Sequence, residues 1–380
     1  MKFLFAPDSF KGSLTSIEIS SCLEKYAKKY FPEAETLSLP IADGGEGIID
    51  ALLLPIGGRR EAITVKGPTG EMTKAEIGYI HEGKTAVLEM AQASGLNLTG
   101  NRKDPFEATS YGTGQMIQHV VNKGVRSIAI GIGGSATNDG GMGALTALGV
   151  TFFDSEGRRL TGCGKNLEKV VRIELDNLYE RFRSIKISVI CDVVNPLLGP
   201  KGATYIYGPQ KGVRPEELED LDKGMGSYIG VVEKTLGKEL RNLPGAGAAG
   251  GMGAALSGFL NAELKPGIDV VLDLAGFDRL IKNVSLVVTG EGRIDRQSVE
   301  FGKVVGGILR RCRMQNVPVA IIAGSMDPSA NLTYKEQMIS IITTVNDVMT
   351  TGQAMGNASE LLESAAERMF SLLKIGQTLK

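Results

Sequence analysis

The chain has 380 residues, of which 42% are hydrophobic and 22% are charged, so its composition excludes a disordered or fibrous protein. Its 42 basic and 43 acidic residues leave a net charge of -1, which gives no electrostatic footprint for nucleic acid or for an anionic membrane. The absence of a long apolar run, of a signal-peptide core and of clustered cysteines predicts a cytoplasmic protein without a membrane span, disulfide scaffold or zinc site.

The first sixty residues alternate between predicted strands and helices. An apolar strand over Lys2–Ala6 precedes a helix that Ser13 is expected to cap and that runs to about Tyr30. A second strand over Thr36–Ile41 precedes a helix near Glu46–Leu54. This order of elements is typical of the start of a parallel sheet.

The middle of the chain has a mixed pattern. Three alternating segments, Arg60–Val65, Thr73–Ile80 and Thr85–Met90, predict β-hairpins. Strands at Ser127–Ile132 and Lys186–Cys191 then follow between predicted helices. A mixed α/β arrangement is expected for this part.

The last hundred residues return to alternation. Strands are predicted at Ser285–Thr289, Pro318–Ala323 and Met338–Val345, with helices near Gly302–Met314 and Asn357–Leu373. The two chain ends together supply five strands, the number that a flavodoxin-like sheet needs.

We therefore expect an α/β protein with two domains. Residues 1–60 and 281–380 are predicted to form a discontinuous flavodoxin-like or Rossmann-like parallel-sheet domain. Residues 61–280 are predicted to form an inserted mixed α/β domain. Nothing in the sequence indicates the oligomeric state.

Two glycine motifs match nucleotide-binding patterns in an unfavourable context. Gly78–Thr85 fits the P-loop pattern, but a strand rather than a helix is predicted after it, which favours a hairpin turn. Ile187–Asp192 resembles a Walker B strand and keeps a P-loop NTPase open as an alternative. Gly245–Gly250 fits the dinucleotide pattern but follows a helix end, which favours close packing on a ligand or on another helix.

The segment GIGGSATNDGG, Gly131–Gly141, is the strongest candidate for a phosphate-binding loop. It follows a predicted strand and precedes a predicted helix, so its amides and hydroxyls are placed to meet an anion at that helix N-terminus. The alternative is a solvated connection, which does not require five glycines in eleven residues. The candidate nucleotide-binding residues of this loop are Gly133, Gly134, Ser135, Thr137 and Asn138.

Three loops at the carboxyl ends of strands in the end-built domain carry acidic residues. In open parallel sheets ligands bind at these ends, near the switch point of the strand order, and a flavodoxin-like order places the first and third loops beside it. For any single carboxylate the alternative is a helix N-cap. The three loops contain Asp8, Ser9 and Lys11; Asp43 and Glu46; and Glu291, Arg293 and Asp295.

Seven strings in chain order resemble the two-domain bacterial glycerate kinases. The resemblance implies a Rossmann-like domain built from both chain ends, an inserted second domain, and ATP-dependent phosphorylation of D-glycerate with release of ADP. It favours the 2-hydroxyl and therefore 2-phosphoglycerate. The strings are PDSFKGS (Pro7–Ser13), PIADGGEG (Pro40–Gly47), GGSATNDGG (Gly133–Gly141), CDVVNPLLGP (Cys191–Pro200), YGPQKG (Tyr207–Gly212), PGAGAAGGMG (Pro244–Gly253) and TGEGRID (Thr289–Asp295).

Phosphoryl transfer requires carboxylates for Mg²⁺, cations and amides for the phosphates, and a base for the hydroxyl. With ATP and Mg²⁺ as expected cofactors, Asp192 is our first candidate for the base, because burial at the end of an apolar strand would raise its pKa. The alternative is that Asp192 only caps the following turn. Asp295, at a predicted helix start, is the second candidate.

The remaining roles follow from charge and shape. A forked guanidinium suits the carboxylate of glycerate, so Arg293 is expected at the substrate. A non-catalytic sensor that binds a phosphorylated metabolite is a further alternative, and turnover distinguishes it from an enzyme. We assign Lys11 as a catalytic cation, Asp8, Ser9 and Asp43 to the substrate, Asp43 and Glu291 to the metal, and Lys211, by itself more often a solvated surface lysine, to the nucleotide.

Overall fold

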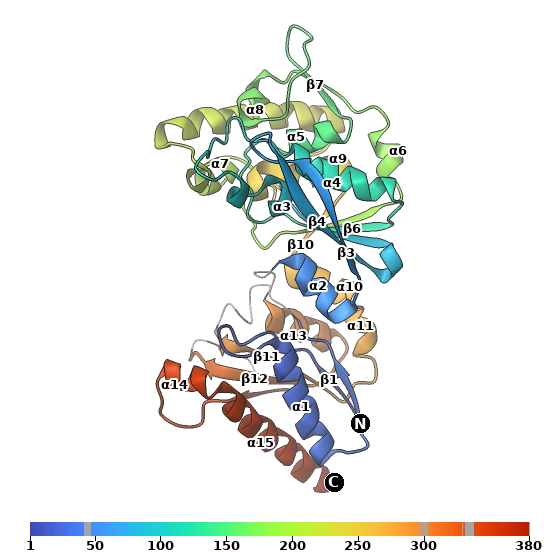
Figure 1. Ribbon diagram of the computed structural model, residues 1–380, viewed down its shortest axis with the longest axis vertical. Coiled ribbons are helices and arrows are strands. Elements are labelled where there is room, and N and C mark those ends of the chain that lie inside the picture. The colour runs from blue at the N-terminus through green and yellow to red at the C-terminus, as the bar shows by residue number, and fades with distance from the viewer. Residues whose placement is uncertain (42–46, 296–297, 299–302, 329, 331–337, 380) are drawn as a thin grey trace. The chain divides into compact units, whose positions relative to one another are not determined.

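The computed structural model describes residues 1–41, 47–295, 298, 303–328, 330 and 338–379. The chain forms two compact units, unit 1 with Met1–Ile56 and Ile268–Lys380, and unit 2 with Gly57–Gly267 (Figure 1). The boundaries differ from the expected residues 60 and 281. Helices α10 (Gly267–Leu274) and α11 (Phe277–Leu280) belong almost entirely to unit 1, because Arg311 pairs with Asp273 at 2.6 Å and with Asp278 at 2.7 Å.

Unit 1 is built on a five-stranded parallel sheet in the order β13-β12-β11-β1-β2. Counted along the chain within this unit, the order is 2-1-3-4-5, which is the flavodoxin-like order. The expected fold class is therefore confirmed, and the switch point lies between β1 and β11. The strands are β1 (Lys2–Phe5), β2 (Glu35–Ser38), β11 (Leu286–Ile294), β12 (Val319–Met326) and β13 (Ile339–Thr343).

Helix α1 (Ser16–Tyr30) begins at a capping box. The Thr15 hydroxyl accepts the N–H of Glu18 at 3.2 Å, and the Glu18 carboxylate accepts the N–H of Thr15 at 2.8 Å. The cap is therefore Thr15 and not Ser13, whose hydroxyl donates instead to the carbonyl of Phe10. The other helices of unit 1 are α2 (Ile48–Ile56), α10, α11, α13 (Val304–Met314), α14 (Thr351–Gly356) and α15 (Ala358–Thr378).

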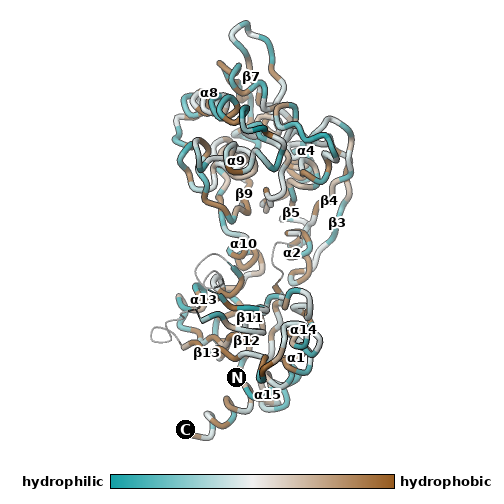
Figure 2. The backbone as a smooth tube through the Cα atoms, turned by 90° about the vertical axis from the view of Figure 1, so that its left-hand side faces the viewer, coloured by the Kyte–Doolittle hydropathy of each residue, from teal (hydrophilic) through white to brown (hydrophobic). Residues whose placement is uncertain are grey.

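Helices α1 and α15 lie side by side on the sheet of unit 1 (Figure 1). Phe3, Phe5 and Phe370 are buried between the helices and the sheet, with Phe370 edge-on to both other rings. Figure 2 shows that hydrophobic residues predominate along β12 and β13. Burial of such apolar side chains contributes about 1.5–3 kcal/mol each, which holds the chain ends together in one unit.

Unit 2 has a mixed six-stranded sheet in the order β10-β9-β6-β5-β4-β3. Strands β3, β4 and β5 pair antiparallel as predicted, and β5, β6, β9 and β10 pair parallel. A small antiparallel pair joins β7 (Thr151–Phe153) to β8 (Arg172–Glu174). The strands of the main sheet are β3 (Arg59–Lys66), β4 (Met72–Ile80), β5 (Thr85–Glu89), β6 (Ser127–Gly131), β9 (Lys186–Ile190) and β10 (Glu263–Lys265).

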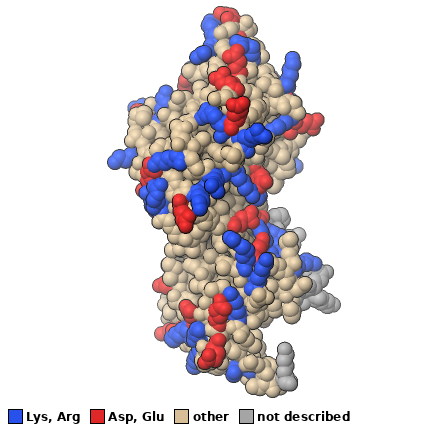
Figure 3. Space-filling model, turned by 90° about the vertical axis from the view of Figure 1, so that its right-hand side faces the viewer, with Lys and Arg blue, Asp and Glu red and all other residues tan. Residues whose placement is uncertain are grey.

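Helices cover this sheet around a core that includes Leu88, Ile130 and Val189, all fully buried. Figure 3 shows basic and acidic side chains close together over the visible surface, in keeping with the near-zero net charge. Among the described residues no helix is both long and apolar enough to cross a membrane. The helices of unit 2 are α3 (Ala91–Ser94), α4 (Tyr111–Asn122), α5 (Met142–Ala147), α6 (Leu178–Phe182), α7 (Ala203–Tyr207), α8 (Leu218–Leu236) and α9 (Met252–Leu260).

The segment Gly78–Thr85 is a β-hairpin turn. It comprises the end of β4, a short 3₁₀ turn at His81–Gly83 and the first residue of β5. Lys84 lies in the turn, and its ammonium pairs with Glu82 at 3.1 Å. Because no helix follows, stacked amides cannot face a phosphate here, and the alternative of a P-loop NTPase at this segment is wrong.

Candidate active site

The loop 132–141 leaves the carboxyl end of β6 and leads into α5, as predicted. Its first part is exposed at Gly133 and Gly134, and the chain is buried from Ser135 onward. The N–H groups of Gly133, Gly134 and Ser135 donate to no acceptor in the described part of the chain. Gly134 has φ 71°, a left-handed conformation that favours glycine. Three free amides, at two exposed glycines and the buried serine that follows them, are suited to an anion.

Lys211 lies directly beneath this turn. Its side chain is only 2% exposed, and the ammonium donates to Ser135 Oγ at 2.9 Å and to the carbonyl of Thr137 at 2.7 Å. Burial lowers the pKa of Lys211 to about 7, although the nearby Asp139 carboxylate acts in the opposite direction. Lys211 is therefore not a solvated surface lysine, and it brings a buried cation next to the three free amides.

Thr137 and Asn138 are fully buried, so neither side chain faces solvent. The amide of Asn138 donates to Thr204 Oγ1 at 3.1 Å. Within the described residues, Thr137 Oγ1 and Asn138 Oδ1 are buried without a hydrogen-bond partner. These two side chains lie in the interior of unit 2. Within this loop, direct contact with phosphate is therefore expected from residues 133–135.

The N-terminus of α5 is already occupied by a side chain of the loop. Asp139 Oδ1 accepts the N–H of Gly141 at 3.1 Å, and Asp139 Oδ2 accepts the N–H of Gly143 at 3.2 Å. The structure therefore does not support an anion at this helix end. The free amides of the loop lie instead at residues 133–135.

The segment Gly245–Gly250 packs on the same loop. The N–H of Gly140 donates to the carbonyl of Gly250 at 2.9 Å. A Cβ at Gly250 would lie 2.1 Å from the carbonyl oxygen of Thr137, so only glycine fits. Among the described residues, the element directly before the motif is helix α8 (Leu218–Leu236) and not a strand. The glycines of the motif therefore serve close packing rather than a dinucleotide.

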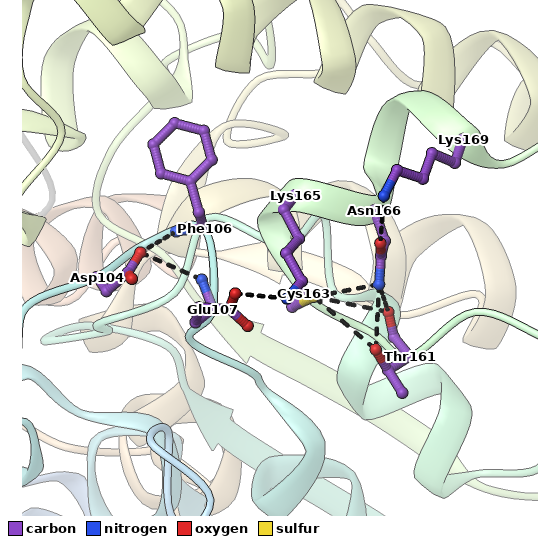
Figure 4. A network of polar contacts seen from close by, with 8 residues as sticks. All are labelled: Asp104, Phe106, Glu107, Thr161, Cys163, Lys165, Asn166 and Lys169. Atoms are coloured by element: carbon purple, nitrogen blue, oxygen red, sulfur yellow. Dashed lines mark hydrogen bonds and ion pairs between the residues drawn. The ribbon is translucent and has the colours of Figure 1, made fainter.

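A polar network joins the segments 104–107 and 161–169 (Figure 4). Asp104 accepts the N–H groups of Phe106 at 3.0 Å and Glu107 at 3.3 Å. Lys165 pairs with Glu107, and the N–H of Lys165 donates to the carbonyl of Phe106 at 2.9 Å. These bonds fix the segment 104–107, which leads directly to Ser110.

Asp192 lies at the same edge of the sheet as the loop. Gly131 of β6 pairs with Ile190 of β9, and Gly133 and Asp192 each come two residues later. Contrary to our expectation of burial, Asp192 is exposed. Its Oδ1 accepts the N–H of Gly267 at 2.8 Å at the start of α10, so it caps this helix rather than the following turn.

In unit 1 the loop after β1 meets β11 across the switch point, as the strand order predicts. The N–H of Asp8 donates to the carbonyl of Gly290 at 2.8 Å. The Asp8 carboxylate accepts the N–H of Ser9 at 2.7 Å and is 5% exposed. Asp8 therefore lies one strand away from Glu291, which follows Gly290.

Glu291 and Arg293 lie within β11 rather than in a loop, because β12 continues to pair with β11 past the end of β1. Glu291 Oε1 is buried without a hydrogen-bond partner among the described residues. Burial raises the pKa of Glu291, a hydrogen bond from the Ser298 side chain and the charge of Lys303 oppose this rise, and Asp8 and Asp295 add to it. An unpaired carboxylate oxygen of this kind is suited to a hard cation.

The other predicted residues of unit 1 are more exposed. Asp295 accepts the N–H of Ser298 at 2.8 Å, and Lys303 approaches it to 4.0 Å. Arg293 pairs with Asp327 at 2.7 Å. Lys11 is exposed in the turn after Asp8.

Asp43 and Glu46 lie outside the described residues. In the described part of the chain, no three His, Cys, Asp or Glu side chains are grouped to hold a metal ion together. The structure thus brings Asp8 and Glu291 together in unit 1, and Asp192, the amides 133–135 and Lys211 to one edge of unit 2.

Sequence reasoning did not identify Asp139 as a buried, hydrogen-bonded residue and did not single out Ser110. Asp139 is fully buried and accepts the N–H of Ser110 at 2.8 Å and its hydroxyl at 2.7 Å. The position of Asp139, just before two glycines and a helix, is the available sequence signal of a capping residue. The contact with Ser110, 29 residues away, has no such signal.

Comparison with known proteins gives one consistent result. The Glycerate kinase family matches residues 3–374. The chain is 40% identical over 380 residues to a glycerate kinase of Bacillus subtilis, covering 100% of this chain and 99% of the relative. It is 40% identical over 377 residues to a glycerate 2-kinase of Escherichia coli, covering 99% of each.

A solved structure agrees with these sequences. The crystal structure of a putative glycerate kinase 2 from Salmonella typhimurium superposes with a TM-score of 0.84 at 39% identity. The superposition covers 100% of this chain and 99% of that chain. The similarity therefore extends over both units and over both groups of candidate site residues.

Proposed function

Because the chain belongs to the glycerate kinase family, we propose that it transfers the γ-phosphoryl group of ATP to D-glycerate and releases ADP. The family match over residues 3–374 is the observation that carries this proposal, since it includes every candidate site residue. Three relatives of 40% identity are named glycerate kinase or glycerate 2-kinase, so the chain is a kinase and the alternative of a non-catalytic sensor is set aside.

We propose the 2-hydroxyl as the acceptor and 2-phosphoglycerate as the product. The name of the Escherichia coli relative, a glycerate 2-kinase, supports this choice. Glycerate also has a hydroxyl at C3, so phosphorylation at O3 is the alternative outcome. The identity of the product therefore needs its own measurement.

The nucleotide phosphates are proposed to bind at Gly133, Gly134 and Ser135. The free amides of these residues and the Lys211 ammonium below them supply donors and positive charge, which phosphoryl transfer requires. Thr137 and Asn138 are proposed to contribute indirectly, because their buried side chains support the conformation of the loop. This assignment places binding of ATP largely in unit 2.

Glu291 and Asp43 are the proposed ligands of Mg²⁺. The buried, unpaired Oε1 of Glu291 and the oxygen-only donor set fit this ion. When bound, Mg²⁺ would neutralise negative charge on the phosphates. Asp8, buried one strand away, adds negative charge to the same place.

Asp192 is the proposed base that takes the proton of the substrate hydroxyl, with Asp295 as the second candidate. The bond from Gly267 to Oδ1 fixes the orientation of Asp192 and leaves Oδ2 to accept a proton. The Asp295 carboxylate is instead bonded to Ser298, which suits a positioning role better.

The carboxylate of glycerate is proposed to bind Arg293, whose guanidinium now pairs with the carboxylate of Asp327. The pair with Asp327 supports this assignment, since the Arg293 guanidinium already binds a carboxylate. Asp8 and Ser9 are proposed to bind the substrate hydroxyls. Lys11 is proposed to neutralise charge on the transferred phosphoryl group.

The experiment measures ADP release by the full chain with ATP, Mg²⁺ and either D-glycerate, L-glycerate or no acceptor. We expect release only with D-glycerate, and ³¹P and ¹H NMR of the product should show phosphate at O2. No glycerate-dependent release would contradict the activity. Phosphate at O3 would contradict only the assigned position.

A further inference from the structure

Asp139 is a buried carboxylate with an unusually full set of donors. It is fully buried, and it accepts four hydrogen bonds, from the N–H and the hydroxyl of Ser110 and from the N–H groups of Gly141 and Gly143. Burial raises the pKa of Asp139 and these four bonds oppose the rise. A buried carboxylate is costly unless it is bonded in this way, so this arrangement holds its neighbours firmly.

Lys211 is a second buried charge that contacts the same loop, although it lies in a different segment. It bonds to Ser135 and Thr137 at the beginning of the loop, whereas Asp139 bonds to Gly141 and Gly143 at its end. No ion pair joins the two charges within the described residues, but their attraction acts to raise the pKa of Lys211. Together they hold both ends of the loop.

Ser110 connects this arrangement to a rigid neighbour. Its hydroxyl donates to Asp139 at 2.7 Å and accepts the N–H of Ala144 at 2.9 Å. The segment before it is fixed by the network of Asp104 and Lys165 (Figure 4). The position of Asp139 is therefore set by residues outside the loop.

We propose that Asp139 is a positioning residue, anchored by Ser110, that acts with Lys211 to hold the amides of Gly133, Gly134 and Ser135 in place for nucleotide phosphates. The inference rests on the proposed function. It adds that affinity for the nucleotide depends on a buried carboxylate that does not touch the nucleotide. Preorganised donors stabilise an anion more strongly than donors that must first be ordered.

The test is Asp139→Asn in the full chain, with binding of ADP measured by calorimetry. The amide removes the negative charge and turns one acceptor oxygen into a donor that faces N–H groups. We expect the Kd for ADP to rise at least about tenfold, since small displacements of binding groups have effects of this size. KM for ATP should rise with it, and KM for D-glycerate should stay within about twofold, because the change is confined to the phosphate loop.

Ser110→Ala is the second variant, in case Asp139→Asn does not fold. It removes one charge-assisted bond and should raise the Kd for ADP about threefold. Asp154→Asn is the matched control in the same unit. Asp154 is also a buried carboxylate that accepts bonds from Glu156 and Arg158, and within the described part of the chain none of its hydrogen bonds involves the loop 132–141. It should lower thermal stability and leave the Kd unchanged.

Each outcome decides one of the two claims. A folded Asp139→Asn or Ser110→Ala variant with the Kd of the unaltered chain overturns the positioning role, as does an equal loss of affinity in Asp154→Asn. An unaltered chain that binds no ADP overturns it as well. A chain that binds ADP with the expected dependence on Asp139, yet transfers no phosphate to glycerate, contradicts the proposed function alone.

Discussion

The N–H of Asp8 donates to the carbonyl of Gly290 across the switch point of the unit 1 sheet. This bond joins the loop after the first strand to the third strand of the sheet, although 282 residues separate them along the chain. It places the buried Asp8 beside Glu291, whose Oε1 has no partner among the described residues. Carboxylates that are far apart in the sequence thereby come together at the end of a parallel sheet where ligands bind.

Lys84→Ala should leave kcat and both KM values within about twofold of the unaltered chain. Lys84 lies in a hairpin turn, and its exposed ion pair with Glu82 contributes about 0–1 kcal/mol to stability. Steady-state kinetics and thermal unfolding of the variant check this. A loss of turnover by orders of magnitude would restore the P-loop interpretation.

Gly134→Val should raise KM for ATP, because a β-branched residue is strained at φ 71° and its Cβ would lie 3.3 Å from Ala91. Gly133→Ala is the matched control in the same turn, since a Cβ there meets nothing within 4 Å. Saturation curves for ATP with both folded variants provide the measurement. Equal KM values in the two variants would argue against phosphate binding at this turn.

Binding of ADP should weaken as the pH rises through about 7, because Lys211, whose pKa is about 7, then loses its charge. The phosphate group titrates in the same range, so the comparison is with Lys211→Met, in which this component of the pH dependence should be missing. Calorimetry between pH 6 and pH 9 measures the difference, a range chosen around the pKa of about 7. Parallel curves for both proteins would refute the role of the lysine.

The same lysine should affect stability in a defined direction. Its pKa of about 7 in the folded chain lies below the ordinary 10.5, so the unfolded chain binds more protons between these values. Because of this group, the free energy of unfolding should increase as the pH rises from about 7 toward 10.5. This increase should be absent in Lys211→Met. Denaturant unfolding at several pH values measures it, and identical slopes would contradict the prediction.

Asp192→Asn should lower kcat at least about 10²-fold with little change in KM for ATP, which is the usual effect of removing a general base. The amide oxygen can still accept the N–H of Gly267, so the cap of α10 is kept and a folding defect is not expected. Rapid kinetics and a thermal unfolding curve check both points. An unchanged kcat would exclude Asp192 as the base and make Asp295→Asn the next variant.

Local patterns of residues were enough to predict the fold class and the order of the elements. Alternating apolar runs and helical segments at both chain ends predicted the five parallel strands, because this pattern depends on local periodicity. The hairpin at Gly78–Thr85 was predictable for the same reason, since the residues after it alternate as a strand. The seven strings were sufficient to indicate the family, which the match over residues 3–374 confirms.

The burial and the hydrogen-bond partners of the site residues became clear only from the folded structure. Three features depend on which distant segments pack nearby. These are the burial of Lys211, the exposure of Asp192 and the hydrogen bonds of Asp139 to the N-terminus of α5. Ser110 lies 29 residues from Asp139, and Gly267 lies 75 residues from Asp192. Burial and long-range hydrogen bonds are properties of the packed chain, and no local pattern of residues specifies them.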